Sequence, residues 1–312
     1  MPMEQMQTTE AKNERSLNTL ARAITLSQNQ FALIIVRCNY VQLRDRVTQQ
    51  LQSRLPFAIQ VLTLPESAKT LYTTIQVAME ERSHHSPTHS PISRPLALMI
   101  FGLETLHDLD QVLIATNIVR EELRKQFPFP LVLWANDEVL RKLERLAPDL
   151  SSWAGNAIVE FEMAIPELVR SLKQHSDRLF NSILSMGDEQ FWAVWQINPP
   201  NALRPNELPF AINDLQSNQY AIDGELQASL DFLLGQTAHS QGEMETAHER
   251  YERSLAFWLQ HMEETGGQES GVRSQESGGK EDKEEEGKGD EGDRGEIPFG
   301  STQGEQNSKF GS

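Results

Sequence analysis

The sequence predicts an α/β protein, a three-layer sandwich built on a mainly parallel sheet of about five strands. The first observation is a set of short, unbroken apolar runs, such as FALIIV at 31–36 and LALMIF at 96–101. Runs of this length suit strands that are buried on both faces. The second is the helical spacing of apolar residues between these runs. The third is the segment 96–137, where a strand, a helix and a strand follow one another as in a right-handed βαβ unit.

The remaining elements of the α/β domain follow from the same two patterns. Strands are expected at 31–36, 57–64, 96–101, 131–134 and 158–161. Helices are expected at 14–27, 41–55, 68–81, 106–127, 137–146 and 166–184. The stretch ERSHHSPTHSPISRP, at 81–95, is polar and carries three prolines, which predicts a loop before the third strand.

Composition divides the chain into five segments. Four prolines between 199 and 209 follow a cluster of aromatic residues, which predicts a linker with an aromatic anchor. The last segment holds twelve of the chain's eighteen glycines and almost no apolar residues, so disorder is expected there. The predicted segments are a disordered N-terminus (1–13), the α/β domain (14–185), the linker (186–221), a helical hairpin (222–262) and a disordered acidic tail (263–312).

Charge and cysteine content narrow the function classes. The formal net charge is −17 and no basic stretch offers several phosphate contacts, so nucleic-acid binding is not expected. No run of eighteen apolar residues is present, which argues against a membrane span. A single cysteine, Cys38, excludes an internal disulfide and agrees with a reducing cytoplasm. We interpret Cys38 as a buried packing residue, because no histidine lies near it in sequence.

A ligand site in such a fold is expected beyond the carboxyl ends of the strands, in the loops 37–41, 64–68, 102–106 and 134–138. The turn after the first strand reads RCNYVQLRD and contains neither the glycines nor the lysine of a phosphate loop. We therefore predict no cofactor. The alternative is an atypical pocket for ATP and Mg²⁺, lined by Arg37, Asn39, Glu104 and Asn136.

Each polar residue at this edge also has a plainer interpretation. Glu104 follows a buried strand, where it is either a metal-binding or water-activating carboxylate, or else a capping residue or an exposed charge at the start of the next helix. We favour the second interpretation. Asn136 and the neighbouring Asp137 precede a helix, so we favour capping over ligand binding. Three histidines in the 81–95 stretch have the side chains of a metal site, but the loop carries no further ligand between them. A solvated insertion is the preferred interpretation of His84, His85 and His89.

The most specific motif lies at 228–261, where residues match the 34-residue tetratricopeptide pattern. The matching positions are Leu234, Gly235, Gly242, Ala247, Tyr251 and Leu255. Small Gly235 and Ala247 allow two antiparallel helices to approach, and Tyr251 fills the space between them. Asp231 and Ala238 depart from the pattern, because aromatic residues are common there, so a simple antiparallel helix pair remains the alternative.

One such repeat cannot bury its own apolar face, and stacks need about three. Either the preceding aromatic segment covers this face or a partner protein does. Aromatic residues dominate interface energetics, so the candidate contact residues are Phe232, Tyr251, Phe257 and Trp258.

The stretch 96–154, from LALMIFGLETLHDLD to FPFPLVLWAND and RLAPDLSSWA, resembles a bacterial family of tetratricopeptide-repeat proteins. FALIIVRCNY, LYTTI and the repeat at 228–261 carry the same resemblance, over roughly residues 16–262. It implies an N-terminal module similar to a degenerate phosphate-loop ATPase of the signalling (STAND or AAA-like) type, joined to a repeat array that binds proteins. This chain departs from the active pattern at 37–44 and carries one repeat, as a truncated relative of longer proteins would.

Three hypotheses follow. The first is a cytoplasmic, non-catalytic interaction protein that binds protein partners through its helical repeat. The second is a nucleotide-dependent switch that uses the atypical pocket. The third is a degraded gene product without a retained role, suggested by the low-complexity ending.

Overall fold

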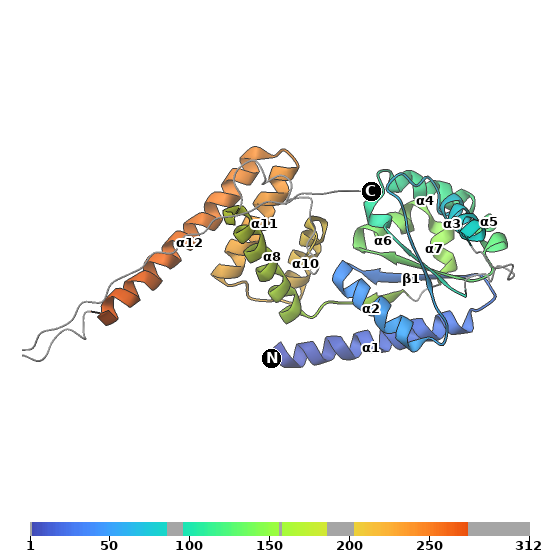
Figure 1. The fold of residues 1–312 in the computed structure, drawn as a ribbon, viewed down its shortest axis with the longest axis horizontal. Coiled ribbons are helices and arrows are strands. Elements are labelled where there is room, and N and C mark those ends of the chain that lie inside the picture. Colours follow the sequence, from blue (N-terminus) through green and yellow to red (C-terminus); the bar gives the residue numbers. More distant parts are fainter. Residues whose placement is uncertain (1, 86–95, 156–157, 186–202, 274–312) are drawn as a thin grey trace, which may run out of the picture. The chain divides into compact units, whose positions relative to one another are not determined.

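The computed structural model describes residues 2–85, 96–155, 158–185 and 203–273. The strands are β1 (Ala32–Cys38), β2 (Gln60–Thr63), β3 (Leu98–Phe101), β4 (Pro130–Ala135) and β5 (Val159–Phe161). The helices are α1 (Pro2–Leu26), α2 (Val41–Arg54), α3 (Leu71–His85), η1 (Leu103–Thr105), α4 (Leu109–Ile118), α5 (Arg120–Gln126), α6 (Asp137–Leu146), α7 (Pro148–Trp153), α8 (Ile165–Ser185), η2 (Pro205–Glu207), α10 (Leu208–Ser217), α11 (Gly224–Ser240) and α12 (Met244–Arg273) (Figure 1).

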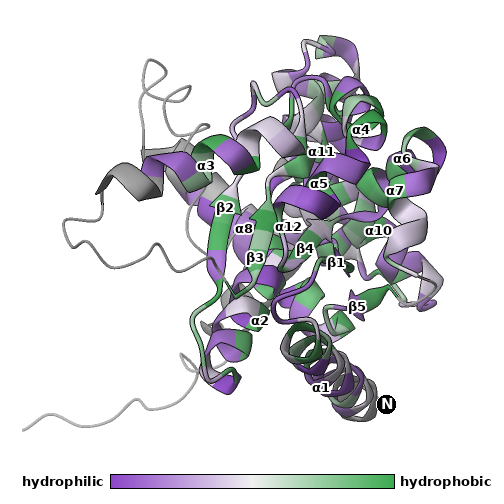
Figure 2. Cartoon of the chain, turned by 90° about the vertical axis from the view of Figure 1, so that its right-hand side faces the viewer, coloured by the Kyte–Doolittle hydropathy of each residue, from purple (hydrophilic) through white to green (hydrophobic). Residues whose placement is uncertain are grey.

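The five strands form one sheet in the order β2-β3-β4-β1-β5, and every neighbouring pair is parallel. The predicted parallel α/β sheet is therefore confirmed. Strand β1 lies between β4 and β5, with Ile34 opposite Val132 and Val36 opposite Val159. The central strands read as continuous apolar runs because both faces of the sheet are covered. Figure 2 shows much of the sheet in the hydrophobic colour, whereas the helices carry both colours.

Alternate residues of each strand belong to two separate cores. Ile34 and Val36 pack with α1, α2 and α8 on one face of the sheet. Leu33 and Ile35 pack with α3 to α7 on the other. This alternation follows from the two-residue period of a strand, and it gives a helix layer on each side of the sheet.

The connections create a switch point between β1 and β4. The chain leaves β1 into α2, which lies on the first face, and leaves β4 into α6, which lies on the second. The two helices diverge from neighbouring strands, so a crevice opens between the carboxyl ends of β1 and β4. This is where parallel α/β sheets place their ligands.

The N-terminal segment differs from the prediction. Residues 2–13, expected to be disordered, belong to α1. One long-range contact explains part of this order. The Nδ2 of Asn13 donates to the backbone oxygen of Glu162 at 2.7 Å, and the Glu162 amide donates back to Asn13 Oδ1 at 3.0 Å. This exchange ties α1 to the chain just after the edge strand β5.

Two other boundaries differ. The predicted helix 106–127 is interrupted at Val119, which ends α4 and precedes α5. Much of the second half of the predicted 186–221 linker is helical, as η2 and α10. Residues 1–262 cluster as one unit, so this segment belongs with the α/β domain rather than between two bodies. The aromatic anchor itself, at 191–195, lies outside the described residues.

Helices α8, α10 and α11 share an apolar core. Leu208, Ala211 and Leu215 bury one side of α10, in the same cluster as Leu226 and Leu230 of α11. Helix α12 continues to Arg273, past the predicted boundary at 263, and the remainder of the predicted tail lies outside the described residues. Within the described ranges, no helix is both long and apolar enough to cross a membrane.

Candidate functional site

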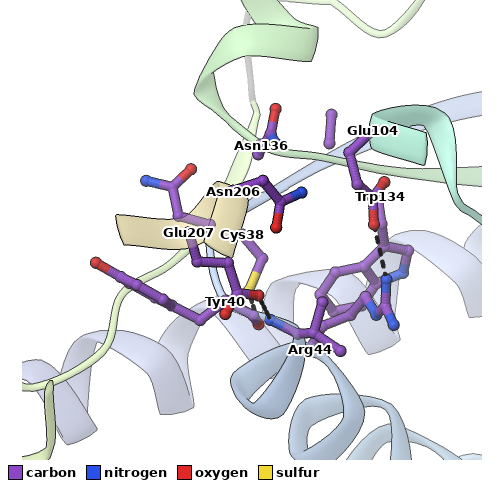
Figure 3. A pocket seen from close by; sticks show the side chains of 11 residues that line it. Cys38, Tyr40, Arg44, Glu104, Trp134, Asn136, Asn206 and Glu207 are labelled. Atoms are coloured by element: carbon purple, nitrogen blue, oxygen red, sulfur yellow. Dashed lines mark hydrogen bonds and ion pairs between the residues drawn. The ribbon is translucent and has the colours of Figure 1, made fainter. Parts of the chain in front are cut away.

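The crevice between β1 and β4 is almost filled. A cavity of about 20 Å³ remains, lined by Cys38, Asn39, Tyr40, Val41, Arg44, Glu104, Trp134, Ala135, Asn136, Asn206 and Glu207. Three of the four predicted loops meet here. The fourth, 64–68, does not, because β2 is the edge strand farthest from β1. Figure 3 shows that η2 brings Asn206 and Glu207 against the residues that follow β1.

Glu207 occupies the N-terminus of α2. Its Oε1 accepts from the Val41 amide at 2.7 Å, and its Oε2 accepts from the Arg204 amide at 2.8 Å. Helix α2 has no cap of its own, because Tyr40 at its N-cap makes no side-chain capping bond and its first turn has no acidic residue. Glu207 therefore supplies, from 166 residues away, the anion that a helix N-terminus favours.

A second carboxylate holds the same segment. Asp214, on α10, accepts from the Tyr40 hydroxyl with 2.6 Å between the oxygens. Burial raises the pKa of Asp214, and the hydrogen bond from Tyr40 opposes this shift. Burial likewise raises the pKa of Glu207, against its two backbone hydrogen bonds. Glu207 is thus buried and Asp214 partly buried, and each accepts one hydrogen bond from the turn after β1.

Arg37 does not line the cavity. It forms a two-point ion pair with Asp137, with 2.8 Å between Nη2 and Oδ2 and a second contact from Nε to Oδ1. Asn39 joins this pair, because its Nδ2 donates to Asp137 at 2.9 Å and its Oδ1 accepts from the Asp137 amide. The hydrogen bonds that Arg37 donates to Asp137 raise the pKa of Arg37. For Asp137, burial acts upward and these hydrogen bonds act downward, and its pKa is lowered overall.

Arg44 is likewise paired with neighbouring side chains in the crevice. Its Nη1 lies 3.2 Å from Glu104 Oε1, and its guanidinium lies 4.4 Å from the centre of the Phe101 ring. Glu104 is therefore a largely buried ion-pair partner, which corrects its interpretation as an exposed charge. Trp134 lies beside them, and its buried Nε1 has no hydrogen-bond partner in the described part of the chain.

Asn136 and Cys38 behave as expected. Asn136 caps α6, because its Oδ1 accepts from the Val139 amide at 2.9 Å. Cys38 is buried, its Sγ donates to the Tyr40 carbonyl, and burial raises the pKa of its thiol to about 12. Such a thiol is a poor nucleophile at neutral pH.

The crevice in this state fits a water-sized occupant, since one water needs about 10–15 Å³ of such volume. Drug-sized ligands and cofactors need roughly 300–1,000 Å³, which is far more than this cavity offers. No group of three histidine, cysteine or acidic side chains suited to a metal is found within the described ranges. Of the three loop histidines, His84 and His85 belong to the end of α3, and His89 lies outside these ranges.

The second candidate region is the helix pair α11–α12. Gly235 faces Tyr251, Asp231 faces Arg250, and Gly224 faces Phe257, an order of contacts that makes the helices antiparallel. The predicted break at 241–242 is present, and Gly242 takes a φ of +81° there.

Asp231, which departs from the tetratricopeptide pattern, has a clear role in this helix pair. Its side chain is 7% exposed and lies 2.6 Å from Arg250 Nη1, so an ion pair replaces an aromatic contact between the helices.

The four predicted contact aromatics are partly buried in this helix pair. Phe232 packs against Tyr251 with ring centres 5.9 Å apart, and Phe257 packs against Gly224 and Trp258. The most exposed large apolar side chains on α12 within the described range are aliphatic: Met244, Leu255 and Leu259. Leu255 and Leu259 lie one turn apart and are 58% and 53% exposed.

Sequence reasoning missed Glu207, Asp214 and Tyr40. A signal for α10 was present, because Pro209 lies in its first turn and Leu208, Ala211 and Leu215 follow at helical spacing. The proline cluster instead suggested a linker. No local pattern indicates that Glu207 reaches α2.

Comparison with known proteins gives no relative for this chain: no family model, curated protein or solved structure matches it. The geometry of the crevice and of the helix pair is therefore the basis for the function proposed below.

Proposed function

We propose that this chain is a cytoplasmic, non-catalytic interaction protein. In this proposal α11 and α12 are a tetratricopeptide-like hairpin that binds a protein partner. The α/β domain is a scaffold related to phosphate-loop ATPases that has lost the phosphate loop. The family resemblance and the helix-pair packing support this assignment together.

The observation that carries the proposal is the apolar stripe of α12. Leu255 and Leu259 are more than half exposed and project from neighbouring turns of one helix. Tyr251 and Phe257 contact α11, and Trp258 packs against Phe257 on α12. A partner that covered the leucines would extend this aromatic layer and bury apolar area that is now in water. We therefore expect the partner to offer an amphipathic helix.

The filled crevice supports the non-catalytic part of the proposal. The basic side chains nearest the expected phosphate position are paired with Asp137 and Glu104, and the α2 N-terminus is occupied by Glu207. A reacting group would need these contacts to break first.

The interaction is tested by affinity capture from the source cells with the full chain as bait. Leu255→Asp is compared with Ala256→Asp, because the two positions are adjacent and exposed but point about 100° apart on the helix. Both variants add one negative charge. A partner captured by the wild type should persist with Ala256→Asp and fall at least tenfold with Leu255→Asp.

Circular dichroism of the three baits checks that the helices are retained. Capture of the same proteins in equal amounts by all three baits would contradict the proposal, and so would a partner lost equally with both variants.

The second candidate is the nucleotide-dependent switch. It is favoured by the meeting of Asn39, Glu104 and Asn136 at the switch point, although Arg37 lies outside that cavity. Calorimetric titration with ATP, with and without Mg²⁺, decides between the two. We expect no heat of binding at millimolar nucleotide. Saturable binding that is lost in Arg37→Ala and kept in Arg46→Ala, at a guanidinium on the outer side of α2, would favour the switch.

A further inference from the structure

We propose that η2 and α10 form a latch over the crevice between β1 and β4, closed by Glu207 and Asp214 and able to open while the sheet stays folded. The inference concerns residues 203–217 and does not depend on the interaction proposed for α12. It gives part of the predicted linker a function as the element that closes this crevice.

The first point of closure is an anion position that the α/β domain does not fill itself. Helix α2 starts directly after a buried strand, with an aromatic N-cap and no acid in its first turn. Its N-terminus carries partial positive charge and unpaired amides. Glu207, which is 3% exposed, brings a carboxylate to this end and contacts the Val41 amide. The same carboxylate bonds the Arg204 amide, which fixes the turn that begins the latch.

The second point of closure lies two helical turns farther on. Asp214 follows Glu207 by seven residues, so both carboxylates project from one side of η2 and α10. Their donors, the Tyr40 hydroxyl and the Val41 amide, are adjacent in the turn after β1. The two hydrogen bonds that attach the latch to the α/β domain therefore both come from the single turn that joins β1 to α2.

The latch can open locally because little of its order is intrinsic. Helix α10 has ten residues, and isolated helices shorter than about 12–15 residues are marginal in water. Its docking depends on the hydrogen bonds of Glu207 and Asp214 and on one apolar side. The β1–β4 ladder, by contrast, is central in the sheet and involves no latch residue. Opening of such a segment is expected to cost less free energy than unfolding of the central strands.

Opening would change the crevice in one definite way. The cavity of about 20 Å³ would become an open cleft, and the Val41 amide at the α2 N-terminus would be freed. Because six residues connect α10 to α11, movement of the helix pair would be transmitted to the latch.

Cys38 provides the test, because it is the only cysteine of the chain, is buried, and lines the cavity that the latch covers. We would measure the rate at which a chromogenic disulfide reagent labels Cys38 in increasing urea. Circular dichroism in the same urea series reports global unfolding. For the wild type we expect two regimes: labelling with weak urea dependence through latch opening, then steep dependence through global unfolding.

Glu207→Gln is the decisive variant. The carboxylate accepts one amide with each oxygen, whereas the glutamine amide has a single acceptor oxygen, so one amide must face an NH₂ group. Losing one charge-assisted hydrogen bond should speed labelling without urea by about tenfold or more. Tyr40→Phe, which removes only the hydroxyl that Asp214 accepts, should speed it as well, and it serves as the independent variant if Glu207→Gln does not fold.

Glu104→Gln is the matched control. It removes a carboxylate from the same cavity, but one that contacts Arg44 and no latch residue. Its labelling without urea should stay within about twofold of the wild type, well below the tenfold effect of a lost charge-assisted bond. Labelling of the wild type that tracks global unfolding at every urea concentration would overturn the latch. Equal acceleration by Glu104→Gln and Glu207→Gln would also overturn it.

Discussion

Substituting Gly235 with alanine is expected to destabilise the protein, and the sign of the effect should reverse when Tyr251 is removed. A Cβ at position 235 would lie 2.9 Å from Tyr251 Cδ1, 3.0 Å from Cε1 and 3.1 Å from Arg250 Cβ. The first distance is shorter than real Cβ contacts, so the Tyr251 ring, the backbone of α12, or both must move. Overpacking of this kind costs about 1–3 kcal/mol.

An opposing term must be subtracted. Glycine within a helix is about 1 kcal/mol less favourable than alanine, and Gly235 lies in the interior of α11. The net effect of Gly235→Ala is therefore a loss of about 1 kcal/mol, within a range of roughly 0–2. In a Tyr251→Ala background the closest two contacts disappear. The same substitution should then raise stability by up to about 1 kcal/mol.

The assay is urea unfolding of the four proteins of this double-mutant cycle, followed by far-ultraviolet circular dichroism. The midpoints are compared, because a chain of this length need not unfold in two states. Stabilisation by Gly235→Ala in the wild-type background would refute the close approach of α11 and α12. The same sign in both backgrounds would refute Tyr251 as its cause.

Substitutions of three other side chains are expected to change stability in a known direction. Burial, aided by Arg178, lowers the pKa of His175 to about 4. The unfolded chain then binds a proton that the folded chain does not, so the free energy of unfolding decreases as the pH is lowered from about 6.5 to 4. His175→Gln should abolish this loss, which amounts to at most about 3 kcal/mol. The measurement is the urea midpoint of both proteins across that pH range, and an unchanged pH dependence in the variant would exclude His175 as the cause. Asn136→Ala should cost about 1 kcal/mol by removing the α6 cap, and an unshifted midpoint would argue against it. Arg250→Ala should cost about 3 kcal/mol because buried Asp231 loses its main partner; the exposed Arg124→Ala is its control in thermal melts, and equal losses would exclude the ion pair.

The sheet was predictable from sequence because its signal is local. A strand buried on both faces must be apolar throughout, and FALIIV and LALMIF satisfy that condition without reference to the rest of the chain. These runs do not specify the order of the strands. That order depends on where each crossover connection places the next strand. An apolar run does not specify which strand will lie beside it in the sheet.

The site was predictable in position but not in content. The topology rule placed Asn39, Glu104 and Asn136 at one edge, and they do line one cavity. Arg37 was expected to join them, but its guanidinium forms an ion pair with Asp137 instead. Proline content concealed the α10 segment, although Pro209 is at a position where proline starts a helix rather than ending one. Glu207 could not be found, because nothing in PNELPF distinguishes a buried carboxylate from a solvated one.

The turn after β1 nevertheless contains an indirect signal. Buried backbone amides are almost always paired, and Tyr40 at the N-cap of α2 provides no acceptor for them. A helix that begins after a buried strand without a cap, an acid or a phosphate loop therefore requires an acceptor from elsewhere. In this chain the acceptor is Glu207, and a phosphate at the same amide would have to displace it. Glu207 and a bound phosphate would thus compete for one backbone donor, the Val41 amide. While Glu207 holds that donor, a phosphate cannot accept from it, so the switch proposed as the second candidate function requires the latch to open.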